Sequence, residues 1–157
     1  MPRLIPYEDT TVPVIKTLAE IEELLVLHHA SAVMREYESG RIKGLAFKTN
    51  TLSFRLPANV EAVYNYLLQK KRDRSRAGRW NAARSPEGQR LVHEQAERCA
   101  WRNVLGAVKS GLALVEIGMV KIEEVFLAYA LSPDGSQTLY QQLAERHFAA
   151  LMPAREG

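Results

Sequence analysis

The fold class is indicated by residues 31–56, which read SAVMREYESGRIKGLAFKTNTLSFRL. Three short runs in this stretch are rich in β-branched and aromatic residues and are separated by turn compositions: 31–37, 42–48 and 52–56. In the last two runs apolar side chains alternate with polar ones, as in strands that bury one face. The stretch predicts a three-stranded antiparallel meander with Lys48 and Arg55 on the solvent-facing side.

Helical patterns flank this meander. Helices are expected over five ranges: 14–27, 60–70, 86–117, 121–131 and 137–151. Asn59 is placed to cap the second of them, Ser85 to cap the third, and Gly118 to end the third. The fold class predicted is therefore α+β: a helix, a three-stranded antiparallel sheet, a helix, and a helical C-terminal half of about three helices.

The length of 157 residues favours one domain with its own core. Residues 1–13 contain three prolines and are expected to form an extended leader. The single α+β domain then covers 14–157, in which 14–70 is the α-β-β-β-α part, 70–84 a basic linker and 85–157 the helical part. The leader lacks the pattern of a targeting signal, and no apolar run reaches the ~18 residues of a membrane span, so a cytoplasmic protein is expected.

Charge is concentrated in residues 70–84, which we call the basic segment. The segment has seven Lys or Arg and one acid, a net charge of +6 in a chain of +3. Its cations are Lys70, Lys71, Arg72, Arg74, Arg76, Arg79 and Arg84. Cations can neutralise phosphates while an aromatic ring such as Trp80 stacks on a base. The segment therefore predicts a nucleic-acid site.

Other cations could enlarge this site. Lys48 and Arg55 would extend the positive surface over the sheet, and further arginines would extend it along the long helix: Arg90, Arg98 and Arg102. We expect a non-enzymatic nucleic-acid-binding accessory protein that prefers single-stranded DNA. Three alternatives stay open: a solvated linker, a protein-interaction module that adapts or inhibits a host protein through an acidic surface, and a homo-oligomer that packs through Gly106 and Gly111.

Catalytic and metal motifs were not found in the sequence. There is no glycine-rich phosphate loop, and the histidines and the cysteine lack the spacing of metal ligands: His28, His29, His93, His147 and Cys99. We therefore expect no enzyme, no metal and no cofactor. Cys99 and Trp101 are expected to be core residues of the long helix.

Two stretches carry a resemblance to other proteins. One is FRLPANVEAVY at 54–64; the other is AWR at 100–102, followed by GMV at 118–120 and EEVFL at 123–127. They resemble a group of short, uncharacterised proteins of bacteriophages and mobile elements, often encoded in regions concerned with DNA replication and recombination. The resemblance covers the chain from Val14 onward. It implies that genetic context, and it implies no activity and no binding residues.

Overall fold

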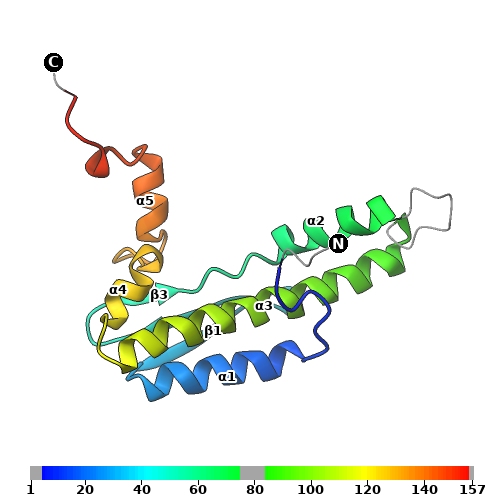
Figure 1. Ribbon diagram of the computed structural model, residues 1–157, viewed down its shortest axis with the longest axis horizontal. Helices are drawn as coiled ribbons and strands as arrows, with labels where there is room; N and C mark the ends of the chain where they lie inside the picture. The colour runs from blue at the N-terminus through cyan, green and yellow to red at the C-terminus, as the bar shows by residue number, and fades with distance from the viewer. Residues whose placement is uncertain (1–4, 75–83, 156–157) are drawn as a thin grey trace. The chain divides into compact units, whose positions relative to one another are not determined.

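The computed structural model describes residues 5–74 and 84–155, which form an α+β structure (Figure 1). The predicted fold class is confirmed: a helix, three antiparallel strands, a helix and further helices follow one another along the chain. The elements are α1 (Val14–Leu27), β1 (Ala32–Glu38), β2 (Arg41–Lys48), β3 (Ser53–Arg55), α2 (Val60–Arg74), α3 (Pro86–Glu116), α4 (Ile122–Phe126), the 3₁₀ turn η2 (Leu127–Tyr129), α5 (Leu139–Glu145) and the 3₁₀ turn η3 (Ala149–Leu151).

The chain divides into two compact units, and each unit combines separate stretches of sequence. The first unit comprises Met1–Leu24 and Ala58–Ser110, and the second comprises Leu25–Pro57 and Gly111–Gly157. The boundary falls inside α1 and again inside α3, so both helices contribute residues to both units.

Helices and the leader form the first unit. In it α2 packs against the first half of α3 through Leu67 and Leu68 on one side and Val92 and Ala96 on the other. Trp101 and Cys99 are fully buried, as the sequence predicted. Burial of these apolar side chains is the main stabilising contribution of the unit.

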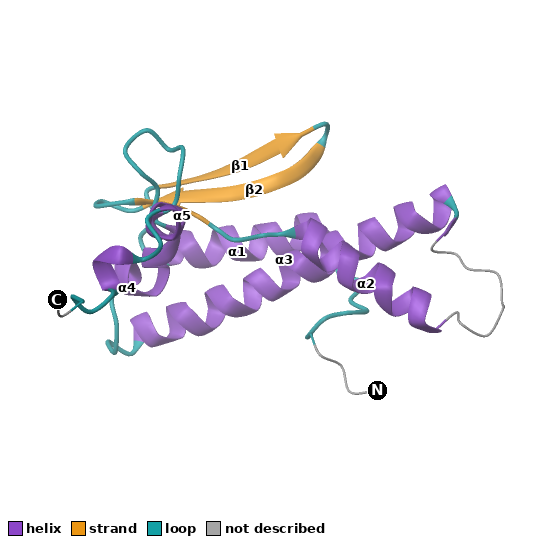
Figure 2. Ribbon diagram, turned by 90° about the horizontal axis from the view of Figure 1, so that it is seen from above, coloured by secondary structure: helices purple, strands orange, loops and turns teal. Residues whose placement is uncertain are grey.

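The sheet in the second unit is the predicted meander, with strand order β1-β2-β3. Figure 2 shows β1 and β2 side by side. Phe47 pairs with Val33 on one side and with Phe54 on the other. Opposed residues of antiparallel strands share a sheet face, so these side chains form its apolar surface. The Phe47 and Phe54 rings stack with centroids 5.0 Å apart, and Phe126 of α4 meets Phe47 edge-on at 5.2 Å.

The sequence predicted solvent-facing cations on the opposite face of the sheet, and the two cations differ in their surroundings. Lys48 is exposed, but Arg55 Nη2 lies 3.2 Å from Glu36 Oε1 and the Arg55 side chain is only 35% exposed. Glu36 pairs with Gly44 in the register of β1 and β2, and a Cβ on Gly44 would meet the Glu36 carboxylate at 3.1 Å. The Arg55–Glu36 ion pair therefore spans β2 from β3 to β1.

Three predicted helix boundaries are confirmed, two by cap hydrogen bonds and one by a backbone angle. Asn59 Oδ1 accepts from the amide of Ala62 at the start of α2, and Ser85 Oγ accepts from the amide of Gly88 at the start of α3. At the other end of α3, Gly118 has a φ of +78°, a conformation in which glycine is unstrained.

The two C-terminal helices are shorter than predicted. The helix expected over 121–131 ends at Phe126, because Leu131 donates its amide to Ser53 O at 2.7 Å and Ala130 bridges to Phe54 of β3. These residues continue the sheet at its β3 edge. Their apolar character suits a sheet edge as well as a helix, so periodicity alone did not distinguish the two.

The helix expected over 137–151 is confined to α5. Thr138 caps it, since Thr138 Oγ1 accepts from the amide of Gln141 and the Gln141 side chain accepts from the amide of Thr138. His147 and Phe148 both have positive φ, 51° and 57°, which ends the helical path.

Candidate nucleic-acid interface

The ends of α2 and α3 that flank the basic segment lie at one end of a helical hairpin. Tyr64 of α2 lies against His93 of α3, with ring centroids 5.5 Å apart, and Leu67 and Leu68 lie in the same cluster as Val92. Both ribbon views place the last turn of α2 and the first turn of α3 at the same end of the pair (Figures 1 and 2). The hairpin tip therefore presents residues from both ends of the basic segment.

The last turn of α2 carries the first cations of the segment. α2 continues through Arg74, so residues 70–74 are helical rather than part of a linker. Lys71 and Arg72 are exposed. Cations are favourable at a helix C-terminus because the macrodipole is negative there, and this gives them a structural role as well.

Lys70 differs from its neighbours. Its ammonium group donates to Glu8 Oε1 of the leader, and the two side chains are 22% and 12% exposed. A half-buried ion pair leaves little of Lys70 for an external phosphate. Lys70 therefore fastens the leader to α2.

The other predicted residues are distributed as follows. Arg84 is exposed directly before the Ser85 cap. Arg76, Arg79 and Trp80, together with the Arg74 side chain, lie outside the part of the chain that the structure describes. Lys48 and Arg55 belong to the second unit, where Arg55 is held by Glu36.

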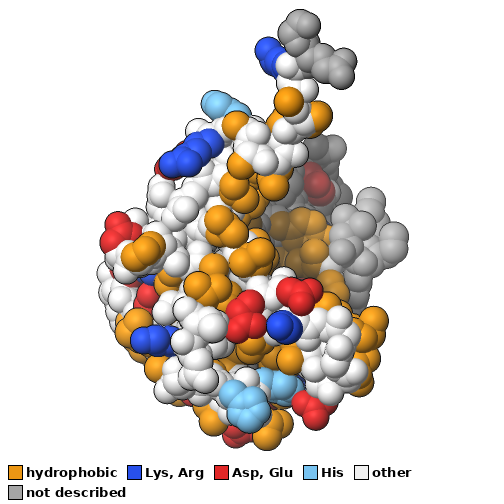
Figure 3. Space-filling view, turned by 90° about the vertical axis from the view of Figure 1, so that its left-hand side faces the viewer, with side chains coloured by type: hydrophobic (Ala, Val, Ile, Leu, Met, Phe, Trp, Pro, Cys, Tyr) orange, Lys and Arg blue, Asp and Glu red, His pale blue; other side chains and the backbone are white. Residues whose placement is uncertain are grey.

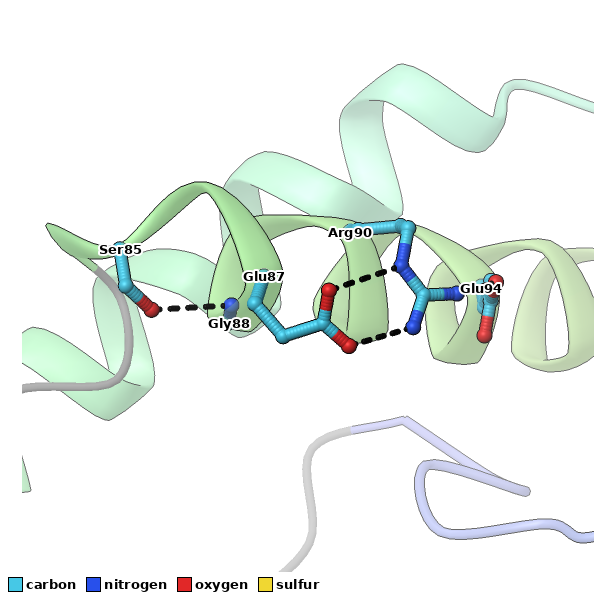
Figure 4. A network of polar contacts seen from close by, with 5 residues as sticks. All are labelled: Ser85, Glu87, Gly88, Arg90 and Glu94. Atoms are coloured by element: carbon cyan, nitrogen blue, oxygen red, sulfur yellow. Dashed lines mark hydrogen bonds and ion pairs between the residues drawn. The ribbon is translucent and has the colours of Figure 1, made fainter.

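The arginines of α3 that were expected to extend the nucleic-acid site donate hydrogen bonds to acceptors within the chain. Arg90 donates to Glu87 and to Glu94, one turn before and one turn after it (Figure 4). Hydrogen bonding and the nearby charge of Arg90 hold the pKa of Glu87 below its ordinary value.

The two other arginines of α3 are also engaged. Arg98 donates to Gln95 Oε1 and to the carbonyl of Thr10. Arg102, expected at the surface, is 20% exposed and lies 3.1 Å from Glu20 Oε1 of α1. The exposed cationic surface is thus narrower than the sequence suggested.

A row of polar side chains on α3 was not recognised in the sequence. Gln95 Nε2 donates to the carbonyls of Glu8 and Thr10 at 3.0 and 2.9 Å, and Asn103 Nδ2 donates to Pro6 O at 2.8 Å. Gln95, Cys99 and Asn103 are spaced by four residues, which places them on one helix face. The spacing of four residues is the sequence signal from which this row could have been predicted. Together they hold the leader along α3.

Cys99 lies beneath this leader and is suited to packing rather than to nucleophilic chemistry. Its Sγ is 3.7 Å from Pro6 O. Burial, followed by the charge of Glu8, raises the pKa of the Cys99 thiol. A thiol with a raised pKa forms little thiolate, the reactive species.

Among residues 5–74 and 84–155, no group of three or more His, Cys, Asp or Glu side chains is placed to hold a metal ion. In the same residues, every helix is too short or too polar to span a bilayer. Comparison with protein-family models, curated proteins and solved structures gives no match. The resemblance to phage and mobile-element proteins stays a prediction.

Proposed function

We propose that this chain is a non-enzymatic accessory protein that binds nucleic acid, preferentially single-stranded DNA, through the tip of the α2–α3 hairpin. The observation that carries the proposal is the net charge of +6 over residues 70–84 in a chain whose total is +3. We further propose that the protein acts inside the cell, in the cytoplasm, as part of a phage or mobile element.

The described ends of the segment support a compact contact surface. Lys71, Arg72 and Arg84 are exposed and come from the two helix ends at the hairpin tip. Arginine presents a planar fork of donors that matches phosphate oxygens. We assign phosphate contacts to these residues and to Arg74, Arg76 and Arg79, and base stacking to Trp80. Lys70, Lys48 and Arg55 are assigned at most a secondary role.

The proposal is tested by fluorescence anisotropy of labelled oligonucleotides of about 20 nucleotides, longer than the ~4–16 nucleotides that small single-strand binding modules cover. We expect binding to single-stranded DNA that weakens steeply between about 50 and 200 mM salt, because phosphate contacts release counterions. Double-stranded DNA and RNA of the same length are measured in parallel. Undetectable binding to all three at the lower salt concentration would refute the proposal.

A charge-reversal variant with a matched control separates a local site from general attraction. The test variant combines Arg74→Glu, Arg76→Glu and Arg79→Glu. The control combines Lys16→Glu, Lys109→Glu and Arg146→Glu, which are exposed cations elsewhere, and both triples change the formal net charge from +3 to −3. We expect the test variant alone to bind much more weakly, with a salt slope that is smaller by roughly three. Equal losses in both triples would contradict a local site; thermal melts verify that both fold.

A protein-interaction module is the second candidate, favoured by exposed apolar side chains in the second unit. Ile117, Met119 and Leu127 are 70%, 68% and 47% exposed, and Figure 3 shows hydrophobic side chains gathered on the face towards α4 and α5. Contiguous exposed apolar surface often marks a protein contact. Capture of a specific protein from nuclease-treated lysate, together with absence of DNA binding, would favour this candidate.

A further inference from the structure

A pocket of about 340 Å³ lies within the second unit, where α1 and α3 end and α4 begins. This volume falls in the range of roughly 300–1,000 Å³ that is typical of small-molecule sites. The basic segment contributes no residue to the pocket, and the inference drawn from it is independent of the proposed function.

Two helix C-termini meet at this pocket. α1 ends at Leu27, and His28 and His29 follow it into the pocket wall; His29 has a φ of +70°, and the next amide, that of Ala30, turns back to Leu25 O at 2.9 Å. α3 contributes its last residue, Glu116. The C-terminus of a helix carries a partial negative charge, so both helix ends favour a cation in the pocket, while the start of α4, a helix of five residues, opposes it with a partial positive charge.

Two carboxylates on different elements add negative charge to the pocket. Glu116 comes from the end of α3 and Glu123 from the first turn of α4. Thr51 Oγ1 donates to Glu123 Oε1 at 2.8 Å. A backbone hydrogen bond, followed by that of Thr51, lowers the pKa of Glu123, and an ionised carboxylate at neutral pH follows. Asn50 adds an amide to the same wall.

Two lysines are next to lining residues in the sequence, Lys48 before Thr49 and Lys121 before Ile122, but neither belongs to the lining. None of the residues that line the pocket is Lys or Arg. His28 Nε2 lies 3.2 Å from Glu116 Oε2, while the Glu116 side chain remains 76% exposed. Lys121 precedes α4 and contributes a smaller part of the lowering of the Glu123 pKa, but it does not line the pocket. Histidine and acidic side chains lie near one another at the lower edge of Figure 3.

The character of the walls favours an organic cation over a metal ion. Leu27, Val115 and Ile122 give the pocket apolar surface beside its carboxylates. Metal sites need several ligands that converge on one point, and the described residues contain no group of three or more suitable side chains.

We propose that this pocket binds an alkylammonium group, with the charged nitrogen between Glu116 and Glu123 and the alkyl chain against Leu27, Val115 and Ile122. A small amine and the lysine side chain of a peptide share this chemistry. Hydrogen bonds from the ammonium to the carboxylates supply the affinity, and the apolar walls contact the alkyl chain.

The first test compares a charged ligand with its neutral counterpart on the full chain by NMR titration. n-Butylammonium chloride is expected to bind saturably with a Kd on the order of 1 mM, as befits so few atoms, and to shift the amide signals of His28, Glu116 and Glu123. 1-Butanol, which has the same chain and no charge, is expected to bind at least about tenfold more weakly. Putrescine and Nα-acetyl-lysine methylamide then distinguish a free amine from a peptide side chain by which binds more tightly. Equal binding of butylammonium and butanol, or no saturable shift, overturns the proposal.

Charge-neutralising variants identify the carboxylates. Glu116→Gln and Glu123→Gln keep the side-chain shape, and each is expected to weaken butylammonium binding about tenfold, because each removes a charged hydrogen-bond acceptor. Glu124→Gln is the matched control: Glu124 is next to Glu123, lies outside the pocket lining, and accepts from the Lys121 amide, which a glutamine oxygen can also do. Circular dichroism verifies folding. If the control weakens binding as much as the two pocket variants, the assignment of the site is wrong.

Discussion

Two glycines of α3 have different surroundings at the scale of single residues. A Cβ built on Gly111 would lie 2.5 Å from Cγ1 of Val125 in α4, which is well inside van der Waals contact. A Cβ on Gly106 would lie 3.8 Å from the Tyr7 ring, an ordinary contact distance. Val125 is β-branched and stiff about χ1 in a helix, so it cannot easily turn away. Gly111 thus permits the close approach of α4 to α3.

The same substitution at these two glycines is expected to have opposite effects. Gly106→Ala should stabilise the protein by about 0.5–1 kcal/mol, since alanine has the higher helix propensity. Gly111→Ala should destabilise it by roughly 1–3 kcal/mol through overpacking against Val125. Urea unfolding of both variants measures the difference. A stabilised Gly111→Ala variant would show that α4 can move away without cost.

Single-residue predictions from sequence succeeded where the cause was local. Alternation within β2 and β3 correctly placed Phe47 and Phe54 on the apolar face. The same alternation could not predict that Arg55 pairs with Glu36, because that contact depends on the register of three strands. The charge of a surface is therefore harder to predict than its polarity: ion pairs between distant residues cancel charges that a local count adds up.

The start of α3 illustrates prediction at the scale of an element. Ser85 Oγ accepts from the Gly88 amide at 3.0 Å, and Glu87 in the first turn pairs with Arg90 (Figure 4). The cap was predicted from the sequence, because a cap and its partner lie within one turn. The Glu87–Arg90 pair was not predicted, since Arg90 was assigned to the nucleic-acid surface instead. The ends of α4 and α5 were predicted less well. Leu131 donates its amide to Ser53 of β3, and positive φ at His147 and Phe148 ends α5.

Removal of the α3 cap tests its contribution. Ser85→Ala is expected to lower the free energy of unfolding by about 1 kcal/mol, within the ~0.5–2 kcal/mol known for N-caps, because one amide of the first turn loses its acceptor. Ser85→Asn, which supplies another side-chain oxygen, serves as the control and should stay within a few tenths of a kcal/mol of the unmodified protein. Both are measured by urea unfolding. Equal stability of the alanine variant and the unmodified protein would mean that solvent replaces the cap without loss.

The two units of the whole molecule share α1 and α3, and this continuity predicts how they unfold. Ile21 and Leu25 are fully buried one turn apart in α1, with the unit boundary between them, and Val108 and Leu112 are related in the same way in α3. Helix formation is cooperative. If one unit unfolded alone, both helices would break next to side chains that are buried in the other unit. We therefore expect a single unfolding transition.

Trp101 provides the probe for this prediction, because it is fully buried in the first unit. The chain has two tryptophans, and Trp80→Phe leaves Trp101 as the one reporter of the first unit. Far-UV circular dichroism reports the helices and strands of both units. If the units unfold together, the fluorescence and dichroism curves in urea coincide in midpoint and slope. Separate midpoints would show that α1 and α3 break at the boundary, and that each unit has a stability of its own.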